Sequence, residues 1–282
     1  LQDEKKGRLR EVVNHECGTV TEMVADDLGI HDYVSTISTA CSSGANSIFF
    51  AARLIKHGFL DVAIAGGVDA LTRFTLNGFN TLQILDRDKC TPMDEHRKGL
   101  NLGEGAGYVV LVSDRIAATM KDKIYCSLTG YANANDAHHQ TASSPEGIGS
   151  FMAMQGALKK SGLAPADISY INLHGTGTHN NDLSESTAIR RLFGDAPPKM
   201  SSTKAFTGHT LGASGGIEAV FSAIAVKENF IYPNLRFQTP IEAMGLIPET
   251  KFSDKYTVNH VLSNSFGFGG NCSSLIFSKY GR

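Results

Sequence analysis

Cys41-Ser-Ser-Gly-Ala-Asn-Ser-Ile-Phe-Phe-Ala-Ala-Arg-Leu-Ile55 is the stretch that decides the fold, because a related stretch occurs again later in the chain. Ala213-Ser-Gly-Gly-Ile-Glu-Ala-Val-Phe-Ser-Ala-Ile-Ala-Val226 lines up with it when Ser43-Gly44 is set on Ser214-Gly215. In each stretch a turn of small residues opens an apolar helix, and the first helix is apolar on nearly every face, which predicts burial. We therefore expect two related halves whose buried helices pack together across a pseudo-twofold axis.

Strands and helices alternate outward from these two stretches. Helices are predicted over residues 43–57 and 148–162, whereas residues 71–102 show weak periodicity and are expected to cross over a sheet. The predicted strands are Val34–Ala40, Asp61–Ala65, Tyr108–Val112 and Asp167–Leu173, the last ending at His174. The short apolar run Asp61–Ala65 is typical of a strand with both faces covered. This alternation predicts a layered α/β fold.

The composition excludes several classes of protein. A chain of 282 residues that is 41% hydrophobic can bury a substantial core, which excludes disorder and fibrous folds. Lys plus Arg number 26 against 28 Asp plus Glu, so the chain lacks the basic excess of a nucleic-acid-binding protein. No apolar run is long enough to cross a membrane, and the charged first residues are unlike a signal peptide. We expect a soluble protein without nucleic-acid or membrane partners.

The five cysteines are few, odd in number and widely scattered, which is unlike a secreted disulfide framework. A reducing, cytoplasmic location is therefore predicted. Cys41 alone lies where a predicted strand ends and a buried helix begins, and a helix N-terminus favours a thiolate with a lowered pKa. The alternative is a small buried hydrophobic residue. Packing roles are assigned to the others, Cys17, Cys90, Cys126 and Cys272.

Two histidines are candidate catalytic residues because of where they lie. His174 opens the turn His174-Gly-Thr-Gly-Thr178 after a strand, and open α/β sheets bind ligands beyond the carboxyl ends of their strands. His209 lies just before the second repeat helix, five residues after Lys204. Each histidine, taken singly, also fits a structural or surface role. Their shared position beside a helix start favours catalysis.

A glycine turn near the C-terminus, within Asn264-Ser-Phe-Gly-Phe-Gly-Gly-Asn271, follows a strand and has amides that can donate to an oxyanion. Its spacing does not match a dinucleotide-binding motif, and no phosphate-binding loop occurs. His174, His179 and Asp182 lack an established metal-ligand spacing, so no metal or cofactor is expected.

Four motifs in order resemble those of the elongating β-ketoacyl-[acyl-carrier-protein] synthases of the KAS I and KAS II type. They are Thr39-Ala-Cys41-Ser-Ser-Gly44, His174-Gly-Thr-Gly-Thr178 with Asp182 and Glu185, Lys204 with Gly208-His209-Thr-Leu-Gly-Ala213, and Asn264–Asn271. The likeness also covers Asn101-Leu-Gly-Glu-Gly-Ala-Gly107. It implies a thiolase-like, duplicated α-β-α layered core. Residues 1–130 would be the C-terminal part of the N-terminal half, and residues 131–282 the C-terminal half.

The resemblance implies a role for each site residue. Cys41 would carry the acyl chain as a thioester, and His174 and His209 would stabilise the enolate formed by decarboxylation of malonyl-carrier protein. The amides of Cys41 and Phe268 would form the oxyanion hole, with Phe268 also resembling the family's gating phenylalanine. Lys204, Glu218, Asp182 and Glu185 would support the site.

The resemblance also bears on partners and alternatives. It implies that the partner is an acyl carrier protein bearing acyl and malonyl thioesters. The synthase itself would form a homodimer or a heterodimer. It would serve chain elongation in a fatty acid pathway or in a polyketide pathway, including an aryl-polyene pathway. The paired His174 and His209 set the chain apart from Cys-His-Asn synthases and from thiolases. A catalytically silent or truncated partner subunit and a cysteine hydrolase using Cys41, His174 and Asn264 stay open.

One departure from the family pattern concerns the N-terminal half. Only 40 residues precede Cys41, whereas family members carry a longer region there. We therefore expect an incomplete first half, with a sheet edge and apolar surface left exposed.

Overall fold

The computed structural model describes residues 15–120 and 123–281, and the chain divides into two compact units, residues 1–38 and 39–282. The first unit contains α1 (Thr19–Leu28), which ends at Gly29 with a left-handed φ of 65°. The predicted strand over Val34–Ala40 is wrong: no regular strand is assigned among these described residues. A strand forms only against a hydrogen-bonding neighbour, and the apolar pattern alone does not supply one.

The second unit contains a five-stranded sheet in the order β3-β7-β6-β4-β5. The pairs β3–β7 and β7–β6 are antiparallel, and β6–β4 and β4–β5 are parallel. The strands are β3 (Ser127–Asn135), β4 (Tyr170–Asn172), β5 (Lys199–Ser201), β6 (His260–Phe266) and β7 (Asn271–Ser278). β4 confirms the predicted strand before His174, so this histidine lies just beyond a strand end.

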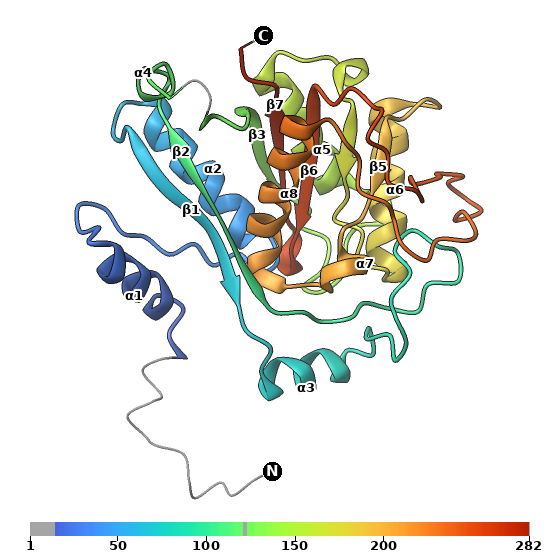
Figure 1. Cartoon of the computed structure of the whole chain (residues 1–282). Coiled ribbons are helices and arrows are strands. Elements are labelled where there is room, and N and C mark those ends of the chain that lie inside the picture. The colour runs from blue at the N-terminus through green and yellow to red at the C-terminus, as the bar shows by residue number, and fades with distance from the viewer. Residues whose placement is uncertain (1–14, 121–122, 282) are drawn as a thin grey trace, which may run out of the picture. The chain divides into compact units, whose positions relative to one another are not determined.

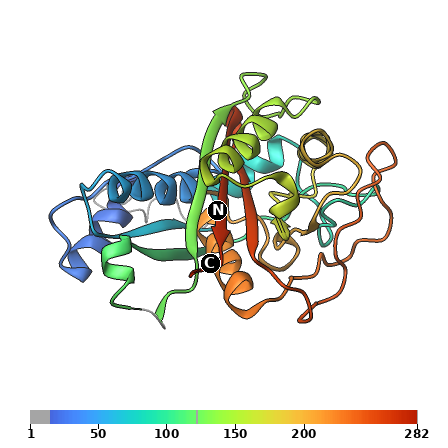
Figure 2. The same ribbon diagram turned by 90° about the horizontal axis from the view of Figure 1, so that it is seen from above.

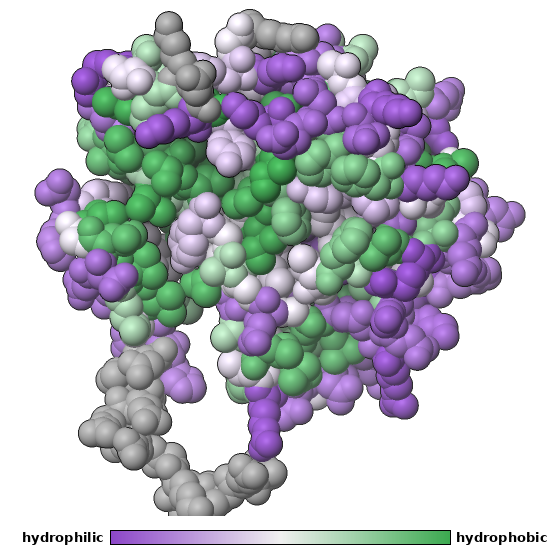
Figure 3. Space-filling view, in the orientation of Figure 1, coloured by the Kyte–Doolittle hydropathy of each residue, from purple (hydrophilic) through white to green (hydrophobic). Residues whose placement is uncertain are grey.

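A second sheet pairs β1 (Val62–Asp69) with β2 (Gly105–Val112) in antiparallel register. The outer side chains of this sheet are exposed, with Ile64 41% and Val110 64% accessible. Hydrophobic side chains gather over these strands in Figure 3. The prediction that Asp61–Ala65 is covered on both faces is therefore wrong, because β1 pairs with β2 alone among the described residues. The expected exposed apolar surface is present.

Helices form two further layers (Figures 1 and 2). α2 (Ser43–Lys56) and α8 (Ser214–Glu228) contact both sheets and lie between them. α5 (Ile148–Ser161) and α6 (His179–Phe193) cover the opposite face of the five-stranded sheet. The remaining helices are α3 (Arg73–Thr81), α4 (Asp114–Ala117) and α7 (Lys204–Thr207). The predicted layered α/β class is confirmed.

The two repeat helices touch at their N-terminal ends, as the internal repeat predicts. A Cβ on Gly44 would lie 2.6 Å from the Gly216 backbone nitrogen, and one on Gly215 would lie 2.4 Å from the Ala45 nitrogen. Only glycine permits backbones to approach this closely. The Ser43-Gly44 and Ser214-Gly215 pairs therefore set where α2 and α8 cross.

α3 lies in the segment where the periodicity is weak. Thr72 caps it, because its side chain accepts a hydrogen bond from the Thr75 amide at 3.1 Å. The nine-residue helix buries none of its side chains fully. Among the described residues, no helix combines the length and apolarity needed to cross a membrane.

Candidate active site

Cys41 lies at a sharp turn immediately before α2 and is 5% exposed. The preceding residue, Ala40, has a positive φ of 51°, which is uncommon for a residue with a side chain. Two serine hydroxyls hold this turn: Ser42 Oγ donates to the Thr39 carbonyl at 2.7 Å and Ser43 Oγ to the Ala40 carbonyl at 2.6 Å. The strained backbone thus presents Cys41 in one fixed orientation.

A polar cluster beneath the turn joins α2 to the glycine turn at the other end of the sequence. Asn271 Oδ1 accepts hydrogen bonds from Ser42 Oγ, Asn46 Nδ2 and Asn133 Nδ2, each between 2.7 and 2.8 Å. Asn271 directly follows the turn that contains Phe268. The Cys41 turn and the glycine turn that contains Phe268 are therefore held together by side-chain hydrogen bonds.

The thiol of Cys41 differs from the expectation of a lowered pKa. Burial raises the pKa of Cys41 to about 11, against the lowering effects of the Lys204 charge and of hydrogen bonds from the Phe268 and Cys41 backbone amides. Desolvation of the thiolate outweighs the helix N-terminus here. The resting residue is therefore a neutral thiol whose sulfur already lies beside two backbone donors.

His174 and His209 face each other beside this thiol. Their ring centroids are 5.3 Å apart with the rings nearly perpendicular, and each residue is 3% exposed. Burial lowers the pKa of both histidines well below the ordinary value, and the nearby Lys204 charge lowers it further. Both imidazoles are therefore neutral at physiological pH, and a neutral imidazole can donate one N–H hydrogen bond.

The ring contacts of the two histidines differ. His209 Nδ1 lies 3.0 Å from Ser214 Oγ, and when Ser214 donates to it the ring hydrogen is on Nε2. His174 Nδ1 is buried and has no hydrogen-bond partner among residues 15–120 and 123–281.

The backbones of both histidines are held by other segments. His174 N–H and Gly175 N–H donate to the two carboxylate oxygens of Glu185 at 2.9 and 2.8 Å, and Asn264 Nδ2 donates to the same carboxylate at 3.0 Å. Burial raises the pKa of Glu185 to about 7. His209 N–H donates to the Asn101 carbonyl at 2.7 Å. Glu185 is thus the residue that holds the His174 turn against α6.

Lys204 and Glu218 form a buried ion pair between α7 and α8. Their side chains are 1% and 3% exposed. Burial raises the pKa of Glu218 to about 7 despite the neighbouring ammonium group. The Lys204 charge lowers the pKa of the Cys41 thiol and of both imidazoles, so it acts electrostatically on all three groups.

A cavity of about 230 Å³ connects these groups. Cys41, His174, His209, Phe266 and Phe268 line it. Further lining comes from the loop Thr141–Ser143, from residues 98–100 and from Thr176 and Thr178. Lys204, Glu218, Asp182 and Glu185 lie outside the lining, where they hold or polarise the residues that form it.

Phe268 contacts α3, a helix that the sequence analysis does not predict. Its ring stacks on Phe79 of α3, with centroids 5.8 Å apart and planes at 17°. Phe79, Asn264 and Ser214 are absent from the set of residues predicted to form the synthase site. Asn264 lies within the motif Asn264–Asn271, but its contact with Glu185 joins β6 to α6 and is visible only in the folded chain.

No group of histidine, cysteine or carboxylate side chains suited to a metal ion occurs within the part of the chain that the structure describes. Asp182 instead accepts hydrogen bonds from the backbone amides of Met93 at 2.8 Å and Gly177 at 3.2 Å. Burial raises its pKa, and Arg97 lies 3.9 Å away. Asp182 therefore holds the turn after His174.

Comparison with known families gives two matches, one after the other along the chain. Residues 2–117 match the N-terminal domain of the beta-ketoacyl synthases, and residues 125–238 match their C-terminal domain.

Among curated proteins, 3-oxoacyl-[acyl-carrier-protein] synthase 2 of Staphylococcus aureus is 39% identical over 268 residues. This alignment covers 92% of the chain and 65% of the relative, so the chain spans just under two thirds of that protein.

Solved structures of ketosynthases also resemble this chain. A type II polyketide ketosynthase in complex with its acyl carrier protein and bound to the hexaketide superposes with a TM-score of 0.92 at 28% identity, covering 96% of this chain and 69% of that one. A ketosynthase in complex with its chain length factor from Xenorhabdus doucetiae gives a TM-score of 0.86 at 37% identity, covering 94% and 64%.

Proposed function

Since the chain belongs to the β-ketoacyl synthase family, we propose that it catalyses acyl transfer to Cys41 and decarboxylative Claisen condensation with malonyl-carrier protein. The observation that carries this proposal is one cavity in which a buried thiol, two neutral histidines and the amide of Phe268 converge. This arrangement provides both a nucleophile and donors for two successive anions.

In the first half reaction the Cys41 thiol attacks the carbonyl carbon of an acyl thioester. A C–S bond forms to Cys41, the carbonyl electrons move to oxygen, and the thiol proton is transferred to the carrier sulfur that will leave. The amides of Cys41 and Phe268 stabilise that oxyanion. When the carbonyl re-forms, the carrier thiolate leaves and takes up the proton. Because the resting thiol has a pKa of about 11, proton transfer accompanies attack.

In the second half reaction malonyl thioester loses CO₂, and the electrons of the broken C–C bond form an enolate. His174 and His209 donate hydrogen bonds to its oxygen, each from the one ring N–H that a neutral imidazole carries. The enolate carbon then attacks the acyl-Cys41 carbonyl. Cys41 leaves as a thiolate and takes up a proton from solvent, since its own proton left with the first carrier thiol, and a 3-oxoacyl product remains on the carrier.

The supporting residues act through position and charge. Lys204, held by Glu218, favours thiolate formation at Cys41 and disfavours protonation of both histidines. Glu185 positions the His174 backbone. Asp182 holds the following turn.

The proposal extends to partners and place. The relatives are named for the acyl carrier protein or solved with one, and one neighbour is solved with a chain length factor. These relatives support a carrier-protein substrate and a role in fatty acid or polyketide elongation. The assembly we propose is either a homodimer or a heterodimer. We place the reaction in the cytoplasm, and we retain the division into halves near residue 130.

Intact-mass measurement after incubation with a panel of acyl-carrier proteins tests the proposal. We expect the protein to gain one acyl group and Cys41→Ala to gain none, whereas Cys126→Ala serves as a matched control that loads normally. Adding malonyl-carrier protein should then yield CO₂ and the 3-oxoacyl product.

Two results would contradict it. Loading of Cys41→Ala would exclude Cys41 as the nucleophile, and the absence of loading in the folded parent protein would favour the silent partner subunit. Release of free acid without malonyl donor would instead indicate the cysteine hydrolase.

A further inference from the structure

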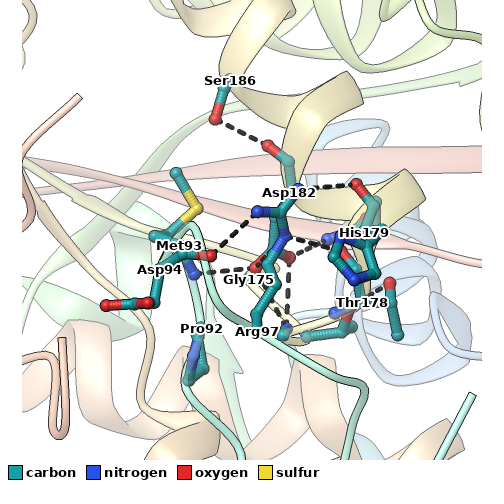
Figure 4. A network of polar contacts seen from close by, with 12 residues as sticks. Pro92, Met93, Asp94, Arg97, Gly175, Thr178, His179, Asp182 and Ser186 are labelled. Carbon is teal, nitrogen blue, oxygen red and sulfur yellow. Dashed lines mark hydrogen bonds and ion pairs between the residues drawn. The ribbon is translucent and has the colours of Figure 1, made fainter. Parts of the chain in front are cut away.

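Three buried charged residues gather where residues 92–100, here called the Arg97 loop, meet the start of α6 (Figure 4). Asp94 is 3%, Arg97 4% and Asp182 0% exposed. Asp94 accepts hydrogen bonds from the backbone amides of Gln238 at 2.6 Å and Thr239 at 2.9 Å. Buried charges are costly unless they are fully paired, so each of these has a definite set of partners.

Arg97 uses all three guanidinium nitrogens on backbone carbonyl groups. Nη1 donates to the Asp94 carbonyl at 2.8 Å, which closes its own loop. Nε donates to the Thr178 carbonyl at 3.3 Å, and Nη2 to the His179 carbonyl at 3.0 Å. The planar fork thereby reaches two consecutive carbonyls at the start of α6, a geometry that lysine does not reproduce.

Asp182 completes the arrangement from the other side. It accepts from Met93 N–H of the Arg97 loop and from Gly177 N–H of the turn after His174. The loop and the turn also pair directly, because Gly99 N–H donates to the Gly177 carbonyl at 3.0 Å. A Cβ on Gly177 would lie 2.7 Å from the Gly99 carbonyl oxygen, and the residue has a φ of +81°. Little displacement is possible at this contact.

The contacts of Arg97 and Asp182 form a clamp, and both segments that this clamp joins contribute to the cavity lining. Lys98, Gly99 and Leu100 come from the Arg97 loop, whereas Thr176 and Thr178 come from the turn. His174 begins that turn and is anchored to the same helix, α6, through Glu185. Cys41 lies just before α2, and Phe268 lies in the connection between β6 and β7. Among the described residues, the side chain of Arg97 donates hydrogen bonds to neither of these segments.

We propose that Arg97 is a positioning residue for the condensation step, acting through Asp182 and the turn Gly175–Thr178 on His174 and on the wall of the cavity. This inference rests on the proposed function. It separates the two half reactions: acyl loading depends on Cys41 and the Phe268 amide, whereas stabilisation of the enolate depends on His174. Loss of the clamp should therefore impair condensation more than loading.

A stabilising role alone does not explain the cluster. A buried ion pair is often no more stabilising than well-packed apolar residues of similar volume. What an apolar replacement does not provide is the set of directed hydrogen bonds that fixes carbonyl and amide groups of both segments. Misplacement of a catalytic group by about 1 Å can cost about 10²-fold in rate.

The test compares Arg97→Gln and Arg97→Lys with the parent protein in two assays on the same samples. Acyl loading of Cys41 is followed by intact mass, and condensation is followed from the preloaded acyl-enzyme with malonyl-carrier protein. We expect Arg97→Gln to lower the condensation rate by about 10²-fold with a much smaller change in loading. The condensation rate of Arg97→Lys should lie between those of the parent protein and Arg97→Gln, because lysine keeps the positive charge but lacks the forked guanidinium group.

Arg190→Gln is the matched control. Arg190 also lies on α6's hydrogen-bonding network, donating to the Met244 carbonyl at 2.8 Å, but it is remote from the cavity lining. It should leave the ratio of condensation to loading unchanged.

Equal loss of loading and condensation in Arg97→Gln, or full activity in it, would overturn the positioning role. Failure of the parent protein to load would instead contradict the proposed function. If Arg97→Gln does not fold, the Arg97→Lys ratio alone decides, since an unchanged ratio there also overturns the proposal.

Discussion

The starts of α2 and α8 occupy equivalent places in the internal repeat but present different groups to the cavity. α2 begins beside Cys41, whose sulfur is contacted by backbone amides. α8 begins with Ser214, which contacts the His209 ring, and one turn later Glu218 pairs with Lys204. The same glycine-mediated crossing therefore supports a neutral nucleophile on one helix and a buried ion pair with a histidine on the other.

This difference shows how the two helix starts of a duplicated scaffold can carry different groups. The crossing of α2 and α8 places both helix starts at one cavity, but residue identity decides which supplies the reacting atom. The charge at the α8 side acts on the thiol at the α2 side, because Lys204 lowers the pKa of Cys41. Altering either side should have separable effects on stability, condensation and loading.

The largest effect on stability is expected from removing the charge on the α8 side. Lys204→Met leaves Glu218 buried without its counter-ion, which should cost about 3–5 kcal/mol of unfolding free energy. Urea denaturation measures this. The double variant Lys204→Met/Glu218→Leu should regain most of the loss, and a single variant as stable as the parent would contradict the ion pair.

The next effect is on chemistry. His209→Ala removes one hydrogen-bond donor to the enolate and should lower the condensation rate by about 10²–10³-fold. Loading of Cys41, measured by intact mass, should change far less. A variant in which loading and condensation fall together would place His209 in the first half reaction instead.

The crossing itself is tested by adding a methyl group. Gly215→Ala places a Cβ 2.4 Å from the Ala45 nitrogen, and overpacking of this kind should destabilise the protein by about 1–3 kcal/mol. Gly78→Ala in α3 is the matched control, since no atom lies within 4 Å of its new Cβ. That variant should be neutral or slightly more stable in thermal unfolding. Equal behaviour of the two variants would refute a tight crossing.

The smallest effect concerns pH. The folded-state pKa of Glu185 is raised from 4.5 to about 7, so the folded state binds its proton more tightly than the unfolded state does. Its contribution to stability is fully present below the unfolded pKa and is lost as pH rises through about 7. Between pH 6 and 8, the Tm of Glu185→Gln should therefore fall by about 2–4 °C less than the Tm of the parent protein does. An unchanged pH dependence would show that Glu185 titrates normally.

Much of the site follows from local sequence patterns. The turn before α2 and the helix itself are visible in the run from Cys41 to Ile55, and the strand ending at His174 is visible in the apolar run before it. The contact between α2 and α8 follows from the repeat, because glycines in matching positions predict a close approach. Where a pattern needs a distant neighbour, as at Val34–Ala40, the prediction of a strand fails.

The sequence by itself predicted Cys41, His174, His209 and Lys204 as site residues, through short motifs that resemble those of a known family, and it predicted the layered α/β class through the alternation of strands and helices. Only the tertiary structure decided that the Cys41 thiol is neutral at rest, that one face of β1 is exposed, and that Asn264 supports Glu185 and Arg97 supports Asp182. The physical reason is that desolvation and hydrogen bonding depend on which distant residues surround a group. A local motif specifies the group but not those surroundings.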